Sequence, residues 1–158
     1  EAAAILSTGR LLGLLARTAC VRDSVLDAGA DWLAARFAPE RVQGFVWAPL
    51  AAYAAAFSNL AHEGADAILQ WCGRELERGF RAGAFDGVAT ARVLLDCDAP
   101  SLPGARFAAQ EILASILGAQ GDDGGFGPGA NSPDRVARSL DALAALQRAR
   151  AAPQRAPA

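Results

Sequence analysis

Two adjacent carboxylates, Asp122 and Asp123, stand in a glycine-rich stretch and could do chemistry as a pair. One could act as a general acid, or both could give oxygen ligands to a divalent cation. The ordinary role of adjacent Asp residues in such a stretch is to form a turn by accepting hydrogen bonds from backbone amides. We expect the turn role here.

Asp96-Cys97-Asp98 is a second acidic group, with two carboxylates and a thiol that one metal ion could reach. It follows a predicted helix, where negative charge opposes the helix dipole. The sole histidine, His62, could act as a base or a metal ligand. Solvated loop acids beside a buried thiol, and a histidine favoured by a helix C-terminus, are the commoner roles. No metal-site spacing links these residues, so we expect neither a metal ion nor a cofactor.

Aromatic side chains are the third group of candidates. Trp47 and Tyr53, six positions apart on one predicted helix, could line an aromatic cavity together with Trp32 and Trp71. Such a cavity can hold an apolar ligand or stabilise a carbocation. Trp47, Tyr53 and Phe126 are therefore the predicted ligand-binding residues, and packing in a helical core is the alternative role of each.

Helices must position all of these side chains. The chain has 158 residues, enough for one domain with a substantial core, and is 53% hydrophobic. Much of that fraction is Ala, and abundant Leu and Arg with few β-branched residues favour an all-α fold. Apolar periodicity, caps and prolines predict seven helices, at about residues 2–19, 23–38, 47–62, 65–78, 87–96, 105–119 and 133–148.

The last predicted helix has the clearest start, with Ser132 as N-cap and Pro133 in the first helical position. Residues 151–158 hold two prolines and no apolar period, so they are predicted to be a flexible tail after a single domain at 1–150. The predicted buried stripe of this helix consists of Val136, Leu140, Leu143 and Leu146.

An internal repeat is visible at an offset of 35 residues, where Gly44-Phe45 recurs as Gly79-Phe80. A competing register matches Gly83-Ala84-Phe85 with Gly124-Gly125-Phe126. In either register each unit is a helix, a Gly-aromatic turn and a second helix. The repeat predicts three hairpins, at about residues 24–62, 65–97 and 105–148.

The stretch from Gln120 to Gly127, followed by a capped apolar helix, resembles the repeat of the terpenoid cyclase and protein prenyltransferase toroids. The resemblance covers about residues 24–148, and the last 40 or so most specifically. It implies an α/α barrel, or an open arc of one, built from paired inner and outer helices. Physically, the Gln120 amide can tie a helix end to the turn, glycines supply positive φ, and Phe126 can fill the gap between helices.

The family's known chemistry does not carry over completely. Class II cyclases use an Asp-x-Asp-Asp acid, whereas Asp96-Cys97-Asp98-Ala99 ends in Ala, which leaves Asp98 as the candidate acid. Prenyltransferase β-subunits bind zinc through Asp, Cys and His, and His62 has no partner at a suitable spacing. The sequence therefore leaves catalysis undecided. Full toroids have about five to seven hairpins, so a further toroid segment or a homo-oligomer could complete the ring.

Charge and cysteine usage argue against several classes of protein. The net charge of −2 comes from 15 basic and 17 acidic residues spread along the chain, so we expect no nucleic-acid partner. The uncharged stretch at 42–61 contains Gly, Pro and Asn, which favours a buried helix over a membrane span. Cys20, Cys72 and Cys97 form no CxxC motif, which fits a reducing, cytoplasmic setting. The chain begins at Glu1 without an initiator Met, which favours a trimmed chain or a segment of something longer over a signal peptide.

These observations predict an apolar small-molecule-binding or tailoring component of secondary-metabolite biosynthesis, with its ligand on a concave face near Trp47, Tyr53 and Asp122. The alternative is a non-catalytic helical-repeat scaffold that binds a protein or peptide. A closed, aromatic-lined cavity of roughly several hundred Å³ would favour the first. A shallow groove with exposed apolar patches would favour the second.

Overall fold

The computed structural model describes residues 1–127 and 133–151. Within these ranges there are seven α-helices, one 3-10 turn at Pro39–Arg41 and no β-strand, so the predicted all-α class is confirmed. None of the described helices is long and apolar enough to cross a membrane. The helices are α1 (Ala2–Leu15), α2 (Asp23–Ala34), α3 (Trp47–Phe57), α4 (Ala65–Arg81), α5 (Gly87–Asp96), α6 (Ala109–Gly118) and α7 (Pro133–Ala151).

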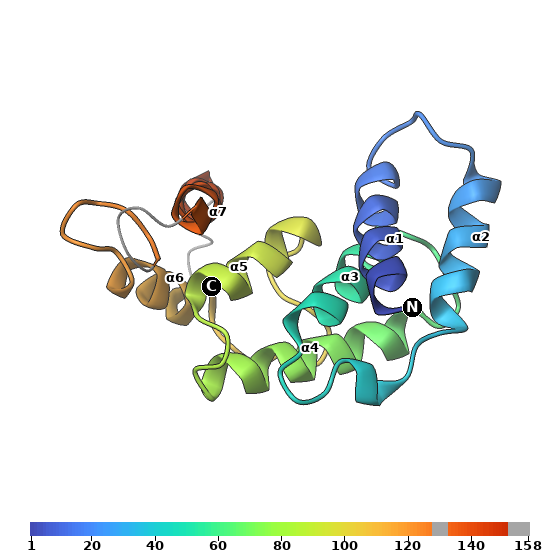
Figure 1. The fold of residues 1–158 in the computed structure, drawn as a ribbon, viewed down its shortest axis with the longest axis horizontal. Coiled ribbons are helices and arrows are strands. Elements are labelled where there is room, and N and C mark those ends of the chain that lie inside the picture. The colour runs from blue at the N-terminus through green and yellow to red at the C-terminus, as the bar shows by residue number, and fades with distance from the viewer. Residues whose placement is uncertain (128–132, 152–158) are drawn as a thin grey trace, which may run out of the picture.

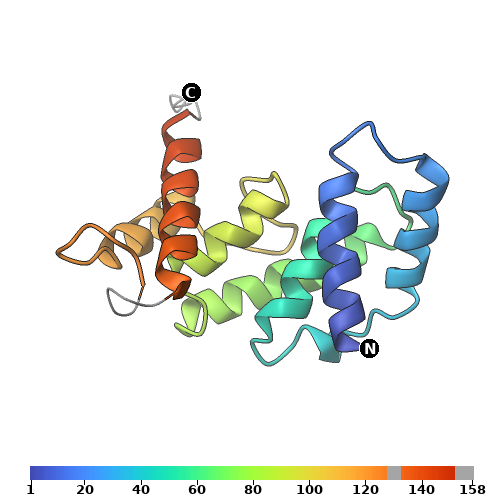
Figure 2. The same ribbon diagram turned by 45° about the horizontal axis from the view of Figure 1, so that its top comes forward.

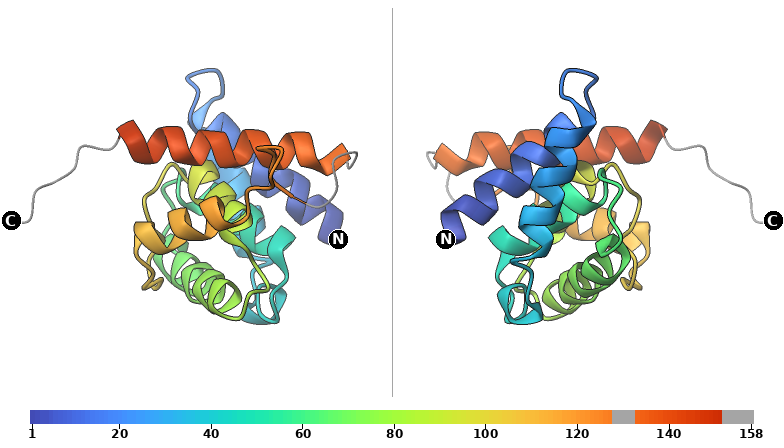
Figure 3. Two further views of the ribbon diagram at one scale, coloured as in Figure 1. Left: turned by 90° about the vertical axis from the view of Figure 1, so that its left-hand side faces the viewer. Right: turned by 90° about the vertical axis from the view of Figure 1, so that its right-hand side faces the viewer.

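The helices form two groups joined by α4 (Figure 1). α1, α2 and α3 lie at one end of the long axis, α5, α6 and α7 lie at the other, and α4 runs along the lower edge. The odd-numbered helices contact one another in chain order, α1 with α3, α3 with α5 and α5 with α7. Figure 2 shows them in that order across the molecule. The end views in Figure 3 show α7 and α4 on opposite sides.

α1 and α3 approach each other closely because small residues face one another. A Cβ atom at Gly9 would lie 2.7 Å from the Ala52 carbonyl oxygen, and one at Gly13 would lie 2.6 Å from that of Ala55. Only glycine allows this backbone separation. Every residue at positions 50–57 is buried, as the nearly continuous apolar sequence predicts for an enclosed helix.

α5 begins and ends as its sequence dictates. Asp86 is its N-cap, as predicted, and its Oδ1 accepts a hydrogen bond from the Ala89 N–H at 2.9 Å. At the other end, the Asp98 N–H donates to the Leu95 carbonyl oxygen at 3.1 Å, and Asp98 adopts a left-handed conformation with φ of 50°. α4 ends at Arg81, and Gly83, two residues later, has a positive φ of 71°.

Four predicted helix ends are wrong by four or five residues: α2 ends at Ala34 and not at residue 38, and the other three have local causes. α1 ends at Leu15, where the Thr18 hydroxyl donates to the Leu15 carbonyl oxygen at 2.8 Å. α3 ends at Phe57, and the Asn59 amide donates to a carbonyl oxygen of its last turn at 2.8 Å. α6 starts only at Ala109, because the preceding loop runs extended along α4.

The structure separates the two registers of the repeat. Gly44-Phe45 lies in a loop with positive φ, whereas Gly79-Phe80 lies inside α4, so the register with an offset of 35 is wrong. Gly83-Ala84-Phe85 and Gly124-Gly125-Phe126 do match. In both, the first glycine has positive φ, at 71° and 79°, and the phenylalanine is buried. The competing register is therefore the structural one.

The predicted buried stripe of α7 is wrong at three of its four positions, and only Leu146 is partly buried against the core. Val136, Leu140 and Leu143 are exposed, and α7 instead buries Ala142 and Ala145. The cause is that α7 packs on α5 through short side chains. Pro133 is the first helical residue as predicted, but the proposed N-cap at 132 lies outside the described residues, as does the predicted tail except for residue 151, which is helical.

Candidate functional site

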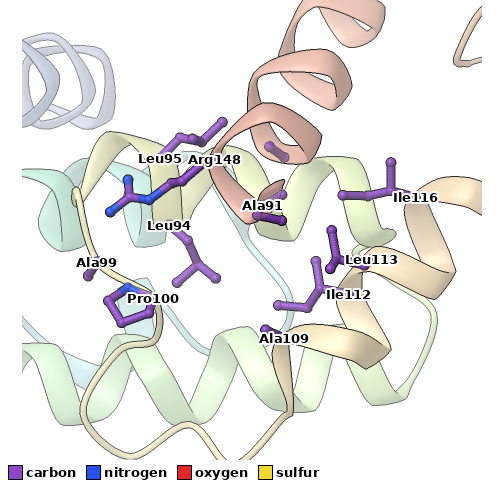
Figure 4. Close-up of a pocket in the computed structure, with 12 residues that line it drawn as sticks. Ala91, Leu94, Leu95, Ala99, Pro100, Ala109, Ile112, Leu113, Ile116 and Arg148 are labelled. Atoms are coloured by element: carbon purple, nitrogen blue, oxygen red, sulfur yellow. The ribbon is translucent and has the colours of Figure 1, made fainter. Parts of the chain in front are cut away.

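A pocket of about 150 Å³ lies between α5, α6 and α7 (Figure 4). Its walls are almost entirely aliphatic, and it is open to solvent on one side. α5 contributes Ala91, Leu94 and Leu95, α6 contributes Ile112, Leu113 and Ile116, and α7 contributes Ala145, Arg148 and Ala149. The arrangement can hold an apolar group in a partly open pocket.

The pocket exists because α6 and α7 both pack on α5 and, over the residues that the structure describes, hardly contact each other. Alanines line the space between these helices, with Ala109 on α6 and Ala145 and Ala149 on α7. Their side chains are too short to fill it. Protein interiors are otherwise close-packed, so an unfilled space of this size is a feature that needs a use or an explanation.

Arg148 is the one charged residue of the pocket wall. It reaches from α7 toward the loop that holds Ala99 and Pro100 (Figure 4). Its Nη1 forms an ion pair with Asp98 Oδ1 at 2.8 Å, and both side chains remain partly exposed. A guanidinium at the edge of an apolar pocket can bind a carboxylate or phosphate oxygen of a ligand.

The glycine-rich turn before α7 has the structural role that its sequence predicts. The Gln120 side-chain amide donates to the Gly124 carbonyl oxygen at 3.0 Å and so ties the end of α6 to the turn. Phe126 is buried, and its backbone N–H donates to Ser139 Oγ of α7 at 3.0 Å. The turn thereby anchors α7.

Asp122 and Asp123 do not act as a pair. Asp123 Oδ1 accepts a hydrogen bond from the Gly125 N–H at 3.1 Å and forms an ion pair with Arg135. The same arginine donates to the Gly127 carbonyl oxygen at 2.8 Å. Asp122 is exposed to solvent. The turn role expected for Asp123 is confirmed.

The acids of Asp96-Cys97-Asp98 point to different partners. Asp96 forms an ion pair with Arg92 at 3.0 Å, and Arg92 also binds Asp141 of α7 at 2.6 Å, whereas Asp98 binds Arg148. Among the described residues no group of three or more His, Cys, Asp or Glu side chains could hold a metal ion. These acids therefore join α5 to α7.

Cys97 itself is buried. Burial raises the pKa of its thiol to about 11, and a hydrogen bond with Ser58 opposes this only in part. The thiol is thus protonated at neutral pH, which makes it a poor metal ligand and nucleophile.

His62 is held in the loop between α3 and α4. Its Nδ1 accepts a hydrogen bond from the Gly64 N–H at 2.9 Å, and its Nε2 lies 3.3 Å from Asp31 Oδ1 of α2. The ring also packs edge-on against Phe57, with centroids 5.5 Å apart. Both ring nitrogens have partners, so the residue fastens this loop to α2.

The three predicted ligand-binding aromatics do not line the pocket. Tyr53 is buried in α3 with its hydroxyl donating to the Arg36 carbonyl oxygen at 3.0 Å, and Trp47 donates to the Ala89 carbonyl oxygen at 3.3 Å. Phe126 is buried beneath the turn that precedes α7. The expected site near Trp47, Tyr53 and Asp122 does not coincide with the aliphatic pocket, because Trp47 and Tyr53 belong to α3 and Asp122 to the turn between α6 and α7.

Trp32 and Trp71 also lie outside the pocket, and each ring stacks with an arginine. The Arg36 guanidinium lies over the Trp32 ring, 4.1 Å from its centroid, and that of Arg74 lies 5.9 Å from the Trp71 centroid. Alanine content does not mark the aliphatic pocket, because α5 and α6 each contain two Ala in ten residues, which is no more than in the chain as a whole.

A second, smaller groove lies where α1, α3 and α5 meet. Arg10, Arg17 and Arg92 line it together with Leu14 and Asp96, and Gly13 and Ala55 leave its floor without bulky side chains. Arg92 is already paired with Asp96 and Asp141, so the positive charge of this groove comes from Arg10 and Arg17.

Comparisons with protein-family models, with curated proteins and with solved structures find no match to this chain.

Proposed function

We propose that this chain binds a small apolar molecule in the pocket between α5, α6 and α7. The observation that carries the proposal is an aliphatic pocket of about 150 Å³, which is smaller, more open and less aromatic than the closed cavity expected from the sequence. A cavity of about this volume with apolar walls holds a ligand of about the size of benzene. The ligand is therefore one such group, or the end of a longer chain that leaves through the open side.

Arg148 suits a ligand with an anionic end. Its guanidinium lies at the edge of the pocket, where a carboxylate or phosphate could replace Asp98 as its partner. The proposed ligand class is thus a short amphiphile with an apolar body and an anionic head. The proposal assigns no catalytic residue, because Asp98 and Asp123 are both held in ion pairs.

An α/α-toroid-like arc is the architecture that we propose around this pocket. The contacts between successive odd-numbered helices and the two matching Gly-x-Phe turns support it. Together with the resemblance of the Gln120 turn to the cyclase and prenyltransferase repeats, they support a ligand-binding or tailoring role in metabolite biosynthesis.

Titration with hexanoate and hexanol, followed by NMR of the methyl groups, tests the proposal. Both probes should shift the signals of Leu94, Ile112 and Ile116. Ala149→Leu fills the pocket and should abolish the shifts, whereas Ala144→Leu, at an exposed position of the same helix, should leave them unchanged. Shifts that survive the pocket-filling substitution would overturn the proposal.

Arg148→Gln tests the anionic head separately. It should weaken hexanoate binding several-fold and leave hexanol binding unchanged, because only the carboxylate uses the guanidinium. Equal weakening of both probes would show that Arg148 supports the pocket wall and does not recognise charge.

The second candidate function is that of a peptide-binding scaffold, which the basic groove between α1, α3 and α5 favours. Leu11 and Leu14 are exposed on α1, and Leu14 lines this groove beside Arg10 and Arg17. An acidic peptide with one apolar anchor fits that chemistry. Fluorescence anisotropy with such a peptide should show binding that Arg10→Gln with Arg17→Gln removes, and unchanged binding would exclude this groove.

A further inference from the structure

α7 forms one wall of the pocket, and little apolar surface holds it in place. Its buried side chains are those of Ala142 and Ala145, which are short, and Leu146 is only partly buried. α7 packs on α5, hardly contacts α6 among the described residues, and lies on the outer side of the molecule in both views of Figure 3. Because the attraction between helices scales with the apolar area that they bury, α7 is held less firmly than the helices of the core.

One end of α7 is anchored by polar contacts. The Phe126 N–H donates a hydrogen bond to Ser139 Oγ at 3.0 Å, and Phe126 itself is buried in the turn before α7. Arg135 forms an ion pair with the same turn, and Arg138 forms one with Asp86 at the start of α5. All of these contacts lie in the first two turns of α7. They fix this end of the helix and leave the other end able to tilt.

Two ion pairs hold the rest of α7 to α5. Arg92 Nη1 lies 2.6 Å from Asp141 Oδ1. Arg148 Nη1 lies 2.8 Å from Asp98 Oδ1. All four side chains are partly exposed, so dissolved salt weakens both pairs. Arg92 is also paired with Asp96, so its charge stays compensated when α7 moves away. α7 can therefore tilt without leaving a buried charge unpaired.

The part of α7 beyond these contacts is stable as a helix. Residues 142–151 consist only of Ala, Leu, Gln and Arg, which are strong helix formers. We propose that α7 is a lid on the aliphatic pocket, which pivots as a helix about its anchored end and which the ion pairs of Asp141 and Arg148 hold closed. The inference rests on the proposed function, because it names how a ligand enters the same pocket.

Tilting of α7 changes the pocket because Ala145, Arg148 and Ala149 form part of its wall. The closed pocket, of about 150 Å³, takes a group of about the size of benzene. The open state admits a bulkier apolar body from the side of α7, and closure retains it. The closed state predominates, so the loss of one ion pair raises the population of the open state several-fold and hardly changes the affinity for a ligand.

The reaction of a buried thiol with an aromatic disulfide reagent measures the opening. Ala142→Cys places a thiol where α7 faces α5, and only tilting of the helix exposes it, since Ala142 is fully buried. Cys20→Ser removes the exposed native thiol, and the buried Cys72 and Cys97 remain as internal references. Mass spectrometry of the peptides distinguishes the three thiols.

The new thiol should react at least ten-fold faster than Cys97, because the lid opens more often than the core. Circular dichroism checks that the variant is folded. Ala145→Cys, at the other buried position of α7, repeats the measurement, so a folding defect in one variant does not decide the outcome. Reaction at the rate of Cys97 in both variants would overturn the proposal.

Salt and one substitution test the ion pairs. From about 0.01 M to about 1 M salt the Debye length falls from about 30 Å to about 3 Å, so the new thiol should react several-fold faster and Cys97 at an unchanged rate. Asp141→Asn should give a similar increase at low salt and reduce the further effect of salt. Asp27→Asn, the same change at an exposed position of α2, should leave the rate unchanged. A rate that neither salt nor Asp141→Asn alters would overturn the proposal.

Hexanol separates the lid from the ligand. The measurements above use the protein without a ligand, so they test the lid even if nothing binds in the pocket. A bound ligand stabilises the closed state, so saturating hexanol should slow the reaction of the new thiol several-fold. If salt and Asp141→Asn speed the reaction but hexanol does not slow it, the lid is supported and the proposed binding of an apolar molecule is wrong.

Discussion

At one end of the molecule α1 lies against α3 through glycines that face alanines, and at the other end α6 and α7 flank α5 and, among the described residues, hardly contact each other. Both ends are rich in alanine. At the first end the absence of bulky side chains lets two backbones approach closely. At the second end they leave a pocket, because a third helix holds α6 and α7 apart.

The comparison shows that small residues alone do not determine packing density. Gly9 and Gly13 remove the last side-chain atoms between two helices, so the gap closes completely. Ala109 and Ala149 remove most of the side chain from helices whose separation is already set by α5. The position of the partner helix decides between a tight contact and a cavity.

Phe126→Ala should have the largest effect on stability, and it acts at the pocket end. Phe126 is 1% exposed, so its removal leaves a cavity beneath the turn that anchors α7. We expect a loss of about 3–5 kcal/mol in the free energy of unfolding, measured by urea denaturation. Phe45→Ala is the control, because Phe45 is 38% exposed and should cost much less. Equal losses would mean that Phe126 does not fix this end.

Gly13→Val should have the next largest effect, and it acts at the tight end. The new Cβ would lie 2.6 Å from the Ala55 carbonyl oxygen and must push α1 away from α3. We expect a loss of about 3 kcal/mol, at the upper end of overpacking effects. Gly118→Val on α6 is the matched control, because nothing lies within 4 Å of its Cβ position. If both substitutions have the same effect, α1 and α3 do not depend on the glycines.

The sequence predicts each helix because local signals mark it. Asp86 as a cap, Pro133 at a helix start and the apolar run around Tyr53 all act within a few residues of themselves. The role of the Gln120 turn is also local, since Gln120 and Gly124 bond each other directly. Features of this kind can be predicted from one sequence.

The pocket and the face of α7 could not be predicted in the same way. The periodicity of Val136, Leu140 and Leu143 indicates one apolar face, but it does not say whether that face meets the core or solvent. The core-facing side of α7 is set by Ala142 and Ala145, whose small size gives a weak pattern. The partner α5 is some forty residues away in the chain, so the choice is a tertiary one.

Alkaline pH should weaken the junction between the two ends, where Cys97 of the α5 terminus lies near Ser58 after α3. Burial raises the pKa of Cys97 to about 11, so between pH 9 and 11 the unfolded chain loses this proton first. Stability is therefore unchanged below about pH 9 and falls as pH rises to 11, by on the order of 2 kcal/mol.

The chain contains no lysine, so no lysine contributes to this alkaline loss. Burial also raises the pKa of Cys72 and of Tyr53, so these groups act in the same direction. Thermal unfolding from pH 8 to 11 should show a shallower decline in Cys97→Ala. Cys20→Ala, at an exposed position, should leave the decline unchanged. A decline that is the same in all variants would contradict the role of Cys97.

Asp98→Asn should have the smallest effect on stability and a visible effect on the pocket. Asn tolerates the left-handed conformation that Asp98 adopts, so only the ion pair with Arg148 is lost. Because both side chains are partly exposed, that pair contributes about 0.5 kcal/mol or less. Arg148 then has no carboxylate partner within the chain at this position, so hexanoate should bind a few-fold more tightly while hexanol binding stays unchanged. Unchanged hexanoate affinity would show that Arg148 is not shared between Asp98 and a ligand, and that the charge at the pocket edge serves only to hold α7 to the end of α5.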